Sequence, residues 1–136
     1  MPTLTRWFIK SAMLYLIAAL VLFIAMQPPL RDQLPFLLVV WPTYLHLLVL
    51  GWLTQLIFGV AFWLFPRYSA AHPRGSERLG WISFFLLNSG LILRAVAEPW
   101  HALGRSTGAL LVLSAVAQLV AGWAFVINTW PRVRER

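Results

Sequence analysis

Residues 43–52 read TYLHLLVLGW, and the same apolar stretch continues through GVAFWLF at 59–65 before it ends at Pro66 and Arg67. The stretch is long enough for one helix, and it carries a single imidazole, that of His46, close to its start. An imidazole in an apolar setting is usually either a hydrogen-bonded polar group or a ligand. The choice between these two roles for His46 is the main question that the sequence raises.

The composition of the whole chain is typical of a membrane protein. Hydrophobic residues make up 60% of its 136 residues and charged residues only 11%, far from the pattern of soluble proteins. Apolar runs at roughly 7–27, 36–65, 81–98 and 107–130 have about the length, ~20 residues, that crosses a hydrocarbon core. None alternates as a barrel strand does, so each must form a helix. We predict one all-α domain over residues 1–136, an integral membrane protein with four antiparallel, up-and-down helices.

The distribution of the basic residues predicts the orientation of these helices. The net charge is +7, which in a soluble domain would suggest nucleic acid. With four spans, however, most cations fall on one side, and we expect the lipid bilayer, not nucleic acid, as their partner. The positive-inside rule then places both termini and the 66–80 loop in the cytoplasm, with the protein in the inner (cytoplasmic) membrane. The cations on that side are Arg6, Lys10, Arg67, Arg74, Arg78, Arg132, Arg134 and Arg136, against Arg31 and Arg105 on the other.

Arg94 is the second residue that needs an explanation, because it lies inside the third apolar run. A charge near the centre of a span costs about 2.5–3.5 kcal/mol on insertion scales. Glu98 follows one helical turn later and His101 closes the run, so Arg94 can pair with Glu98 or extend to the interface. Because neighbouring spans run in opposite directions, Arg94, Glu98 and His101 should lie in the same half of the membrane as His46.

Several classes of chemistry receive no support from the sequence. There is no cysteine, hence no disulfide or iron–sulfur cluster. No nucleophile–base arrangement, carboxylate pair or phosphate loop is present, so we identify no catalytic residue and expect no turnover by the chain itself. A protein-only zinc or copper site needs three or more ligands, and His46 and His101 are the only candidates on their side.

Haem remains as a cofactor that these residues could hold. An axial ligand requires a neutral imidazole on a helix, apolar neighbours for the macrocycle and a cation near the propionates. His46, the leucines and valine beside it, and Arg94 meet these requirements, with His101 as a further candidate for second ligand or propionate partner. The alternative is a small transport or accessory protein in which His46 is structural. A proton-coupled exporter would need a membrane carboxylate, and Glu98 lies almost at the end of its span.

Two spans carry stripes of small and polar residues that favour helix packing. In the second span they are Gly51, Gln55 and Gly59, and in the fourth Ser114, Gln118, Gly122 and Asn128. Four short helices cannot easily enclose a macrocycle, so we expect a homo-oligomer.

The second span resembles helix two of the catalytic subunit of the haem–copper oxidase superfamily, especially its nitric oxide reductase-like and C-type oxidase-like branches. The matching residues are His46, the following 47–52, then 59–61 and the closing 64–67, within a stretch of about 25 residues that the resemblance covers. In that family a histidine near the outer end of this helix binds low-spin haem b. The resemblance therefore implies that His46 is a ligand to haem iron.

The resemblance also bears on assembly and activity. That subunit consists of three four-helix arcs around a pseudo-three-fold axis, and this chain resembles one arc, which favours a homotrimer. A dimer in which two His46 residues share one haem is the alternative. The paired-histidine helix and all copper ligands are missing here, so oxygen or nitric oxide reduction is not implied. Electron transfer or haem-dependent sensing is the expected role, and the sequence names no redox partner.

Overall fold

The computed structural model describes residues 1–66, 68 and 74–133, and the described chain is all-α. This confirms the predicted fold class. The elements in chain order are α1 (Thr3–Ala25), α2 (Leu30–Gln33), η1 (Pro35–Val39), α3 (Trp41–His46), η2 (Leu47–Thr54), α4 (Gln55–Leu64), α5 (Glu77–Ala102), α6 (Gly108–Thr129) and η3 (Trp130–Arg132).

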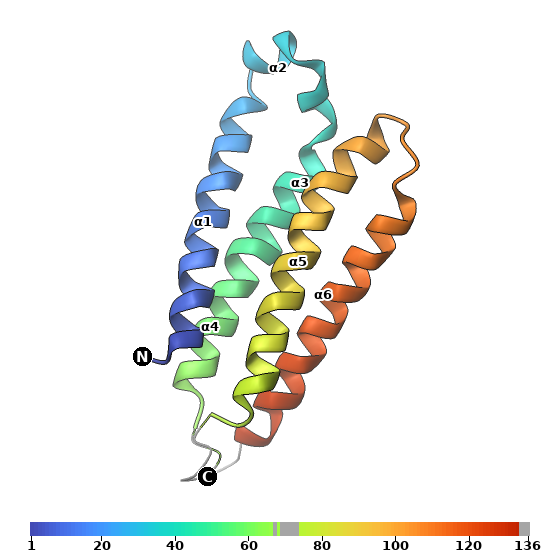
Figure 1. Cartoon of the computed structure of the whole chain (residues 1–136). Helices are drawn as coiled ribbons and strands as arrows, with labels where there is room; N and C mark the ends of the chain where they lie inside the picture. The colour runs from blue at the N-terminus through green and yellow to red at the C-terminus, as the bar shows by residue number, and fades with distance from the viewer. Residues whose placement is uncertain (67, 69–73, 134–136) are drawn as a thin grey trace.

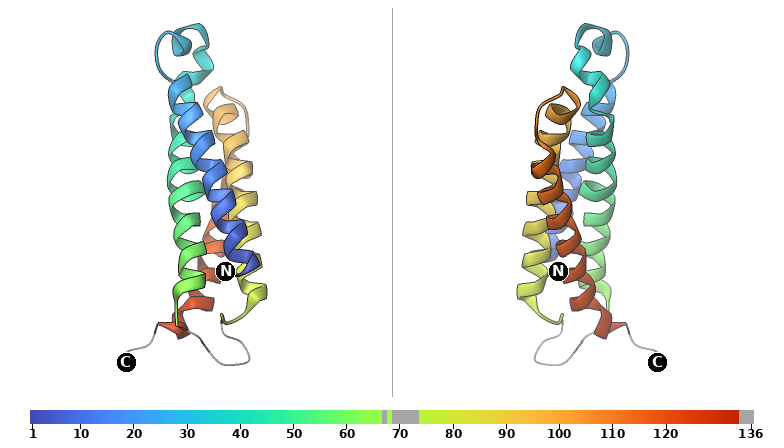
Figure 2. Two further views of the ribbon diagram at one scale, coloured as in Figure 1. Left: turned by 90° about the vertical axis from the view of Figure 1, so that its left-hand side faces the viewer. Right: turned by 90° about the vertical axis from the view of Figure 1, so that its right-hand side faces the viewer.

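Among the described residues, four helical runs are long and apolar enough to cross a membrane: Thr3–Ala25, Trp41–Leu64, Glu77–Ala102 and Gly108–Arg132. They run up and down, and both termini lie at one end of the bundle (Figures 1 and 2). We call this the terminal end and the opposite one the distal end. The architecture is compatible with a multi-pass membrane protein. Of the cations used to predict orientation, Arg67, Arg134 and Arg136 lie outside the described residues.

The second span is continuous but not uniform. It begins with Pro42 in its first turn, where a missing N–H does no harm, and ends at Leu64 before an extended Phe65 and Pro66. Between its α-helical parts, η2 is a π-helix of eight residues that begins directly after His46. Such wide turns are rare, and they are frequent at functional sites.

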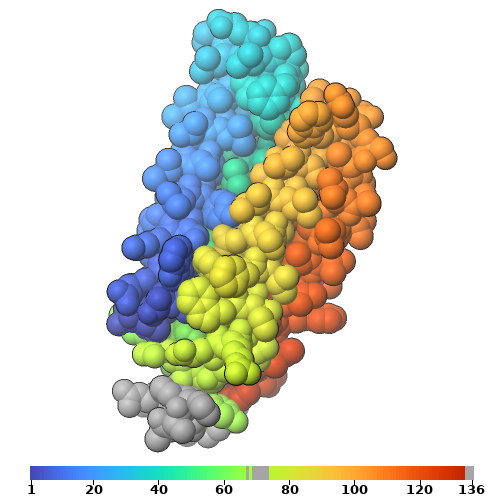
Figure 3. Space-filling view, viewed as in Figure 1, coloured from blue at the N-terminus to red at the C-terminus, as the bar shows by residue number. Residues whose placement is uncertain are grey.

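The helices pack in the order α1, second span, α5, α6, with α5 and α6 side by side along their length (Figures 1 and 2). Toward the terminal end an apolar core joins them, in which Phe8 of α1 lies edge-on to Phe84 of α5 and Phe58 of α4 stacks on Phe125 of α6 at 3.8 Å. Toward the distal end α1 and α5 separate, and the second span is visible between them (Figure 3). There a second, smaller apolar cluster of Met26, Leu37 and Val40 joins α1 to the start of the second span, and α3 needs other contacts to reach α5 and α6.

Glycines bring α1 against the second span, as the predicted stripe requires. A Cβ on Gly51 would lie 2.7 Å from Cγ of Tyr15, and one on Gly59 would lie 2.8 Å from Cβ of Phe8. Gln55, completely buried, accepts a hydrogen bond of 2.8 Å from Asn88 of α5. The second span thus packs on both of its neighbours, one through glycines and the other through an amide pair.

The cation Arg132 lies at the terminal end in a way the sequence does not predict. Instead of facing water it is 1% exposed. Its guanidinium donates to the carbonyl oxygens of Phe62, Phe65 and Pro66 at 2.8–3.1 Å. Carbonyl oxygens at and just beyond the end of a helix lack N–H partners within the helix, and the guanidinium provides donors for them. Arg132 therefore ties the end of the fourth span to the end of the second.

Candidate functional site

His46 is the last residue of α3, and its ring is oriented by its own helix. The Nδ1 atom lies 2.8 Å from the carbonyl oxygen of Pro42, one turn earlier. A carbonyl can only accept, so Nδ1 carries the proton and donates it. The ring extends toward α5, and 29% of the side chain is exposed.

Glu98 of α5 meets the same ring from the neighbouring helix. Its Oε1 lies 3.1 Å from Nδ1 of His46 and accepts a hydrogen bond of 3.2 Å from Nη1 of Arg94. Its Oε2 accepts a hydrogen bond of 3.1 Å from the hydroxyl of Thr43 in α3. With 10% of its side chain exposed, the carboxylate is held on both oxygens. The predicted ion pair between Arg94 and Glu98 is confirmed.

Arg94 connects this pair to α6. Its Nε donates to the hydroxyl of Ser114 at 3.1 Å, and its Nη2 donates to the carbonyl oxygen of Leu111 at 3.4 Å. The side chain is 16% exposed, so it is held between helices and does not extend to an interface. Three helical runs, α3, α5 and α6, therefore meet through one guanidinium and one carboxylate.

The fourth contact of Arg94 determines the state of the imidazole. Nη1 of Arg94 lies 3.3 Å from Nε2 of His46, and a guanidinium can only donate. This contact fits an imidazole with its lone pair on Nε2 and its proton on Nδ1. In that form the cluster of His46, Arg94 and Glu98 contains one cation and one anion, which lowers the cost of its burial.

The sequence-predicted residues are only partly brought together. His46, Arg94 and Glu98 form one cluster, whereas His101 is exposed in the last turn of α5 and shares no hydrogen bond or ion pair with His46 in the described chain. The sequence reasoning missed Thr43, and it gave Ser114 as a helix-packing residue and not as a partner of Arg94. A single hydroxyl in an apolar helix is a weak signal, and only the distance to Arg94 or Glu98 distinguishes these two.

The described residues include no group of three or more His, Cys, Asp or Glu side chains that could hold a metal ion. A metal at His46 would therefore have to bring its other ligands with it, as a haem does.

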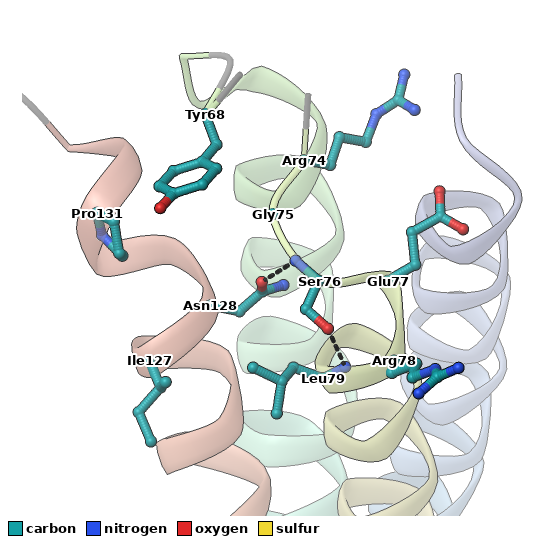
Figure 4. A pocket seen from close by; sticks show the side chains of 10 residues that line it. All are labelled: Tyr68, Arg74, Gly75, Ser76, Glu77, Arg78, Leu79, Ile127, Asn128 and Pro131. Carbon is teal, nitrogen blue, oxygen red and sulfur yellow. Dashed lines mark hydrogen bonds between the residues drawn. The ribbon is translucent and has the colours of Figure 1, made fainter. Parts of the chain in front are cut away.

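A separate hollow of about 800 Å³ lies at the terminal end between the start of α5 and the end of α6. Two hydrogen bonds within its lining hold the start of α5: the backbone N–H of Ser76 donates to Asn128 at 2.8 Å, and the Ser76 hydroxyl accepts from Leu79 (Figure 4). The side chain of Arg74 extends away from Asn128 (Figure 4). The hollow thus presents a capped helix start and not a converging set of ligands.

Comparisons of the chain with protein-family models, with curated proteins and with solved structures found no match.

Proposed function

We propose that this protein binds haem b through Nε2 of His46 and serves in electron transfer or haem-dependent sensing. The observation that carries the proposal is the orientation of the imidazole. Its Nδ1–H donates to the Pro42 carbonyl at 2.8 Å and lies beside the Glu98 carboxylate. Metal-bound histidines typically donate their second ring nitrogen to such a carbonyl or carboxylate. The lone pair is then on Nε2, the atom that an axial ligand uses.

The surroundings of Nε2 fit the cofactor once Arg94 turns aside. In the structure Nη1 of Arg94 lies 3.3 Å from Nε2, within the space that an iron atom would need. The contact is long for a hydrogen bond, and Arg94 keeps Glu98, Ser114 and the Leu111 carbonyl as partners if it breaks. Turned from the ring, the guanidinium remains near enough to pair with a propionate.

Exposed apolar side chains near His46 in the second span are available to a macrocycle. Leu45, Val49 and Leu53 follow one another at spacing four along the second span, and each is 40–45% exposed. A bound haem would supply one-electron redox chemistry, while the chain provides the axial nitrogen, the cation and this apolar wall. His101, exposed at the distal end of α5, is a candidate propionate partner or second ligand.

The same proposal includes a homo-oligomer, with a trimer favoured and a dimer as the alternative. A single chain offers one wall to a macrocycle, so further walls have to come from other copies. Exposed apolar side chains line the outer faces of the first and last spans, including Ile17, Val21, Val116 and Trp123. Their place at the two ends of the helix order suits contacts with neighbouring copies, as in the three arcs of the resembled subunit.

We further propose the inner (cytoplasmic) membrane, with both termini in the cytoplasm. The terminal end carries Arg6, Lys10, Arg74, Arg78 and Arg132, and the distal connections carry Arg31 and Arg105. The positive-inside rule relates this asymmetry to orientation.

A second candidate function is a non-haem transport or accessory protein in which His46 is structural. One observation favours it: both ring nitrogens of His46 already have partners, Pro42 and Glu98 on one side and Arg94 on the other. In that case the cluster only joins α3, α5 and α6 in the distal half.

The absorbance of the purified protein separates the two candidates. Protein made in cells with ample haem should show a Soret band, and its pyridine haemochrome should identify haem b. Colourless protein, which also fails to bind added hemin in detergent, would leave the structural role of His46 as the better explanation.

A further inference from the structure

We propose that Glu98 is a positioning residue that keeps His46 protonated on Nδ1 and thereby strengthens the donor Nε2. This inference rests on the proposed haem function for its consequence but not for its geometry. Glu98 would touch neither iron nor macrocycle. It acts through the imidazole, and Thr43 and Arg94 hold it in place.

The geometry allows only one neutral form of the ring. With the proton on Nε2, an N–H would face the donor Nη1 of Arg94 at 3.3 Å. The unprotonated Nδ1 would then face the Pro42 carbonyl at 2.8 Å and the Glu98 carboxylate at 3.1 Å, both of which only accept. Every contact of the ring would become repulsive, so the form with the proton on Nδ1 is selected.

Of the two groups beside Nδ1, Glu98 contributes the charge. The Pro42 carbonyl accepts the hydrogen bond, but it is a backbone dipole that any residue at position 42 would supply. The carboxylate is 10% exposed, and charges interact more strongly when water is largely excluded. A negative charge 3.1 Å from Nδ1 draws the proton toward it and leaves more electron density on Nε2.

Thr43 makes this arrangement specific. Without a second anchor, the Glu98 carboxylate could turn wholly toward Arg94 of its own helix. The Thr43 hydroxyl, three residues before His46 on α3, binds Oε2 at 3.1 Å, which leaves Oε1 between Arg94 and the ring. Thr43 is 5% exposed, and a buried hydroxyl of this kind is costly to leave without a partner.

The charge of Glu98 should affect two properties of a bound haem, its affinity and its midpoint potential. If haem were bound at Nε2, the Glu98 carboxylate would favour its more positive ferric state and make the imidazole a stronger donor. Loss of such an outer partner typically weakens metal affinity by about 10- to 100-fold. Glu98→Gln keeps the shape and removes the charge. It should weaken hemin binding by that factor and raise the midpoint potential of the haem that remains bound.

The first test needs no haem. Protein labelled with ¹⁵N-histidine, in detergent and without haem, should show a proton on Nδ1 and none on Nε2 for the signal that disappears in His46→Ala. In Glu98→Gln the population with the proton on Nε2 should rise. Protonated Nε2 in the wild-type protein would overturn the inference, whether or not haem binds.

The second test uses hemin titration and redox potentiometry of the same variants. Thr43→Val keeps both charges of the Arg94–Glu98 pair, so it should destabilise the fold less than Glu98→Gln does. It should shift affinity and potential in the same direction as Glu98→Gln, but less. Glu77→Gln, at the other end of α5, is the matched control and should change neither hemin affinity nor midpoint potential.

If wild-type protein binds haem and Glu98→Gln binds it equally well at an unchanged potential, the inference fails and the proposed function stands. If wild-type protein binds no haem, the proposed function fails and the ¹⁵N result alone decides.

Discussion

At the scale of single residues, charged side chains join α3, α5 and α6 in the distal half, beside an apolar cluster of Met26, Leu37 and Val40 at the distal end of α1. Arg94 lies within hydrogen-bond reach of His46, Glu98 and Ser114, from three different helical runs. The ion pair of Arg94 and Glu98 stabilises the fold only while both charges are present. Removing either of these two residues leaves a buried charge that nothing compensates.

We therefore expect Arg94→Met to lower the free energy of unfolding by about 3–5 kcal/mol, because Glu98 loses its cation in a largely buried site. Thermal unfolding in detergent measures the loss. Arg105→Met is the control. Its guanidinium is exposed and lies over Trp100 at 4.8 Å, a contact that contributes about 0.5–1 kcal/mol at an exposed site. The double variant Arg94→Met/Glu98→Gln should recover part of the loss, and a double variant no better than Arg94→Met would contradict the charge argument.

The sequence predicts this cluster as far as helical spacing allows. Arg94 and Glu98 are four residues apart, so their pairing follows from one helix alone. Antiparallel spans bring them to the level of His46. The contacts to Thr43 and Ser114 depend on how each helix is rotated about its axis, and a sequence of almost uniform hydrophobicity leaves that rotation open. The choice of Nδ1 as the protonated atom depends on the same rotation.

At the scale of elements, the second span is distinguished by how closely α1 approaches it. Gly51 lies within the π-helix η2 and faces Tyr15 of α1. Gly59 lies two turns further on, in α4, and faces Phe8. The backbone of the span is in contact with α1 side chains at both points, so added volume there has no room.

Gly51→Ala should lower the free energy of unfolding by about 1–3 kcal/mol, the usual cost of overpacking. The new Cβ would be 2.7 Å from Cγ of Tyr15, and the ring can move only if α1 moves with it. Gly122→Ala in α6 is the matched control, because its Cβ would meet nothing within 4 Å. It should be neutral or slightly stabilising, since alanine favours helices. Equal effects of the two changes on the melting temperature would contradict the close packing of α1.

The glycine stripe is predictable because small residues at spacing four have few other uses in a membrane helix. The π-helix is not. Its residues, 47–54, are as apolar as those around them, and one extra residue per turn leaves no mark in such a sequence. The stripe on the fourth span, predicted as a packing face, meets α5 at three of its four members. Ser114 binds the Gly90 carbonyl, Gln118 lies against Gly90, and Asn128 binds the start of α5, whereas Gly122 has open space.

At the scale of the whole molecule, the four spans pack side by side in chain order. The terminal half has an apolar core, and the distal half opens between α1 and α5 (Figure 3). The number of helices follows from the lengths of the apolar runs, and their up-and-down order follows from consecutive spans that each cross the membrane. The order in which they pack does not, because helices of similar hydrophobicity can be arranged in several ways.

Native mass spectrometry in detergent tests the proposed assembly. We expect three chains, with one haem per chain, because each chain contributes one His46 and one apolar wall. A dimer with one haem per two chains would replace the trimer by the shared-haem alternative. A monomer under conditions that preserve the haem would remove both.

The central claim is that His46 is the axial ligand, and the Soret band of two histidine variants tests it most directly. Both are purified from haem-replete cells and compared with wild type at equal protein concentration and equal elution volume. His46→Ala should elute as wild type does and lose the Soret band, whereas His101→Ala, altered at an exposed position, should keep a Soret band, at a shifted wavelength if His101 is the second ligand. A well-folded His46→Ala protein that retains the full Soret band, or a wild-type protein without one, would contradict the account.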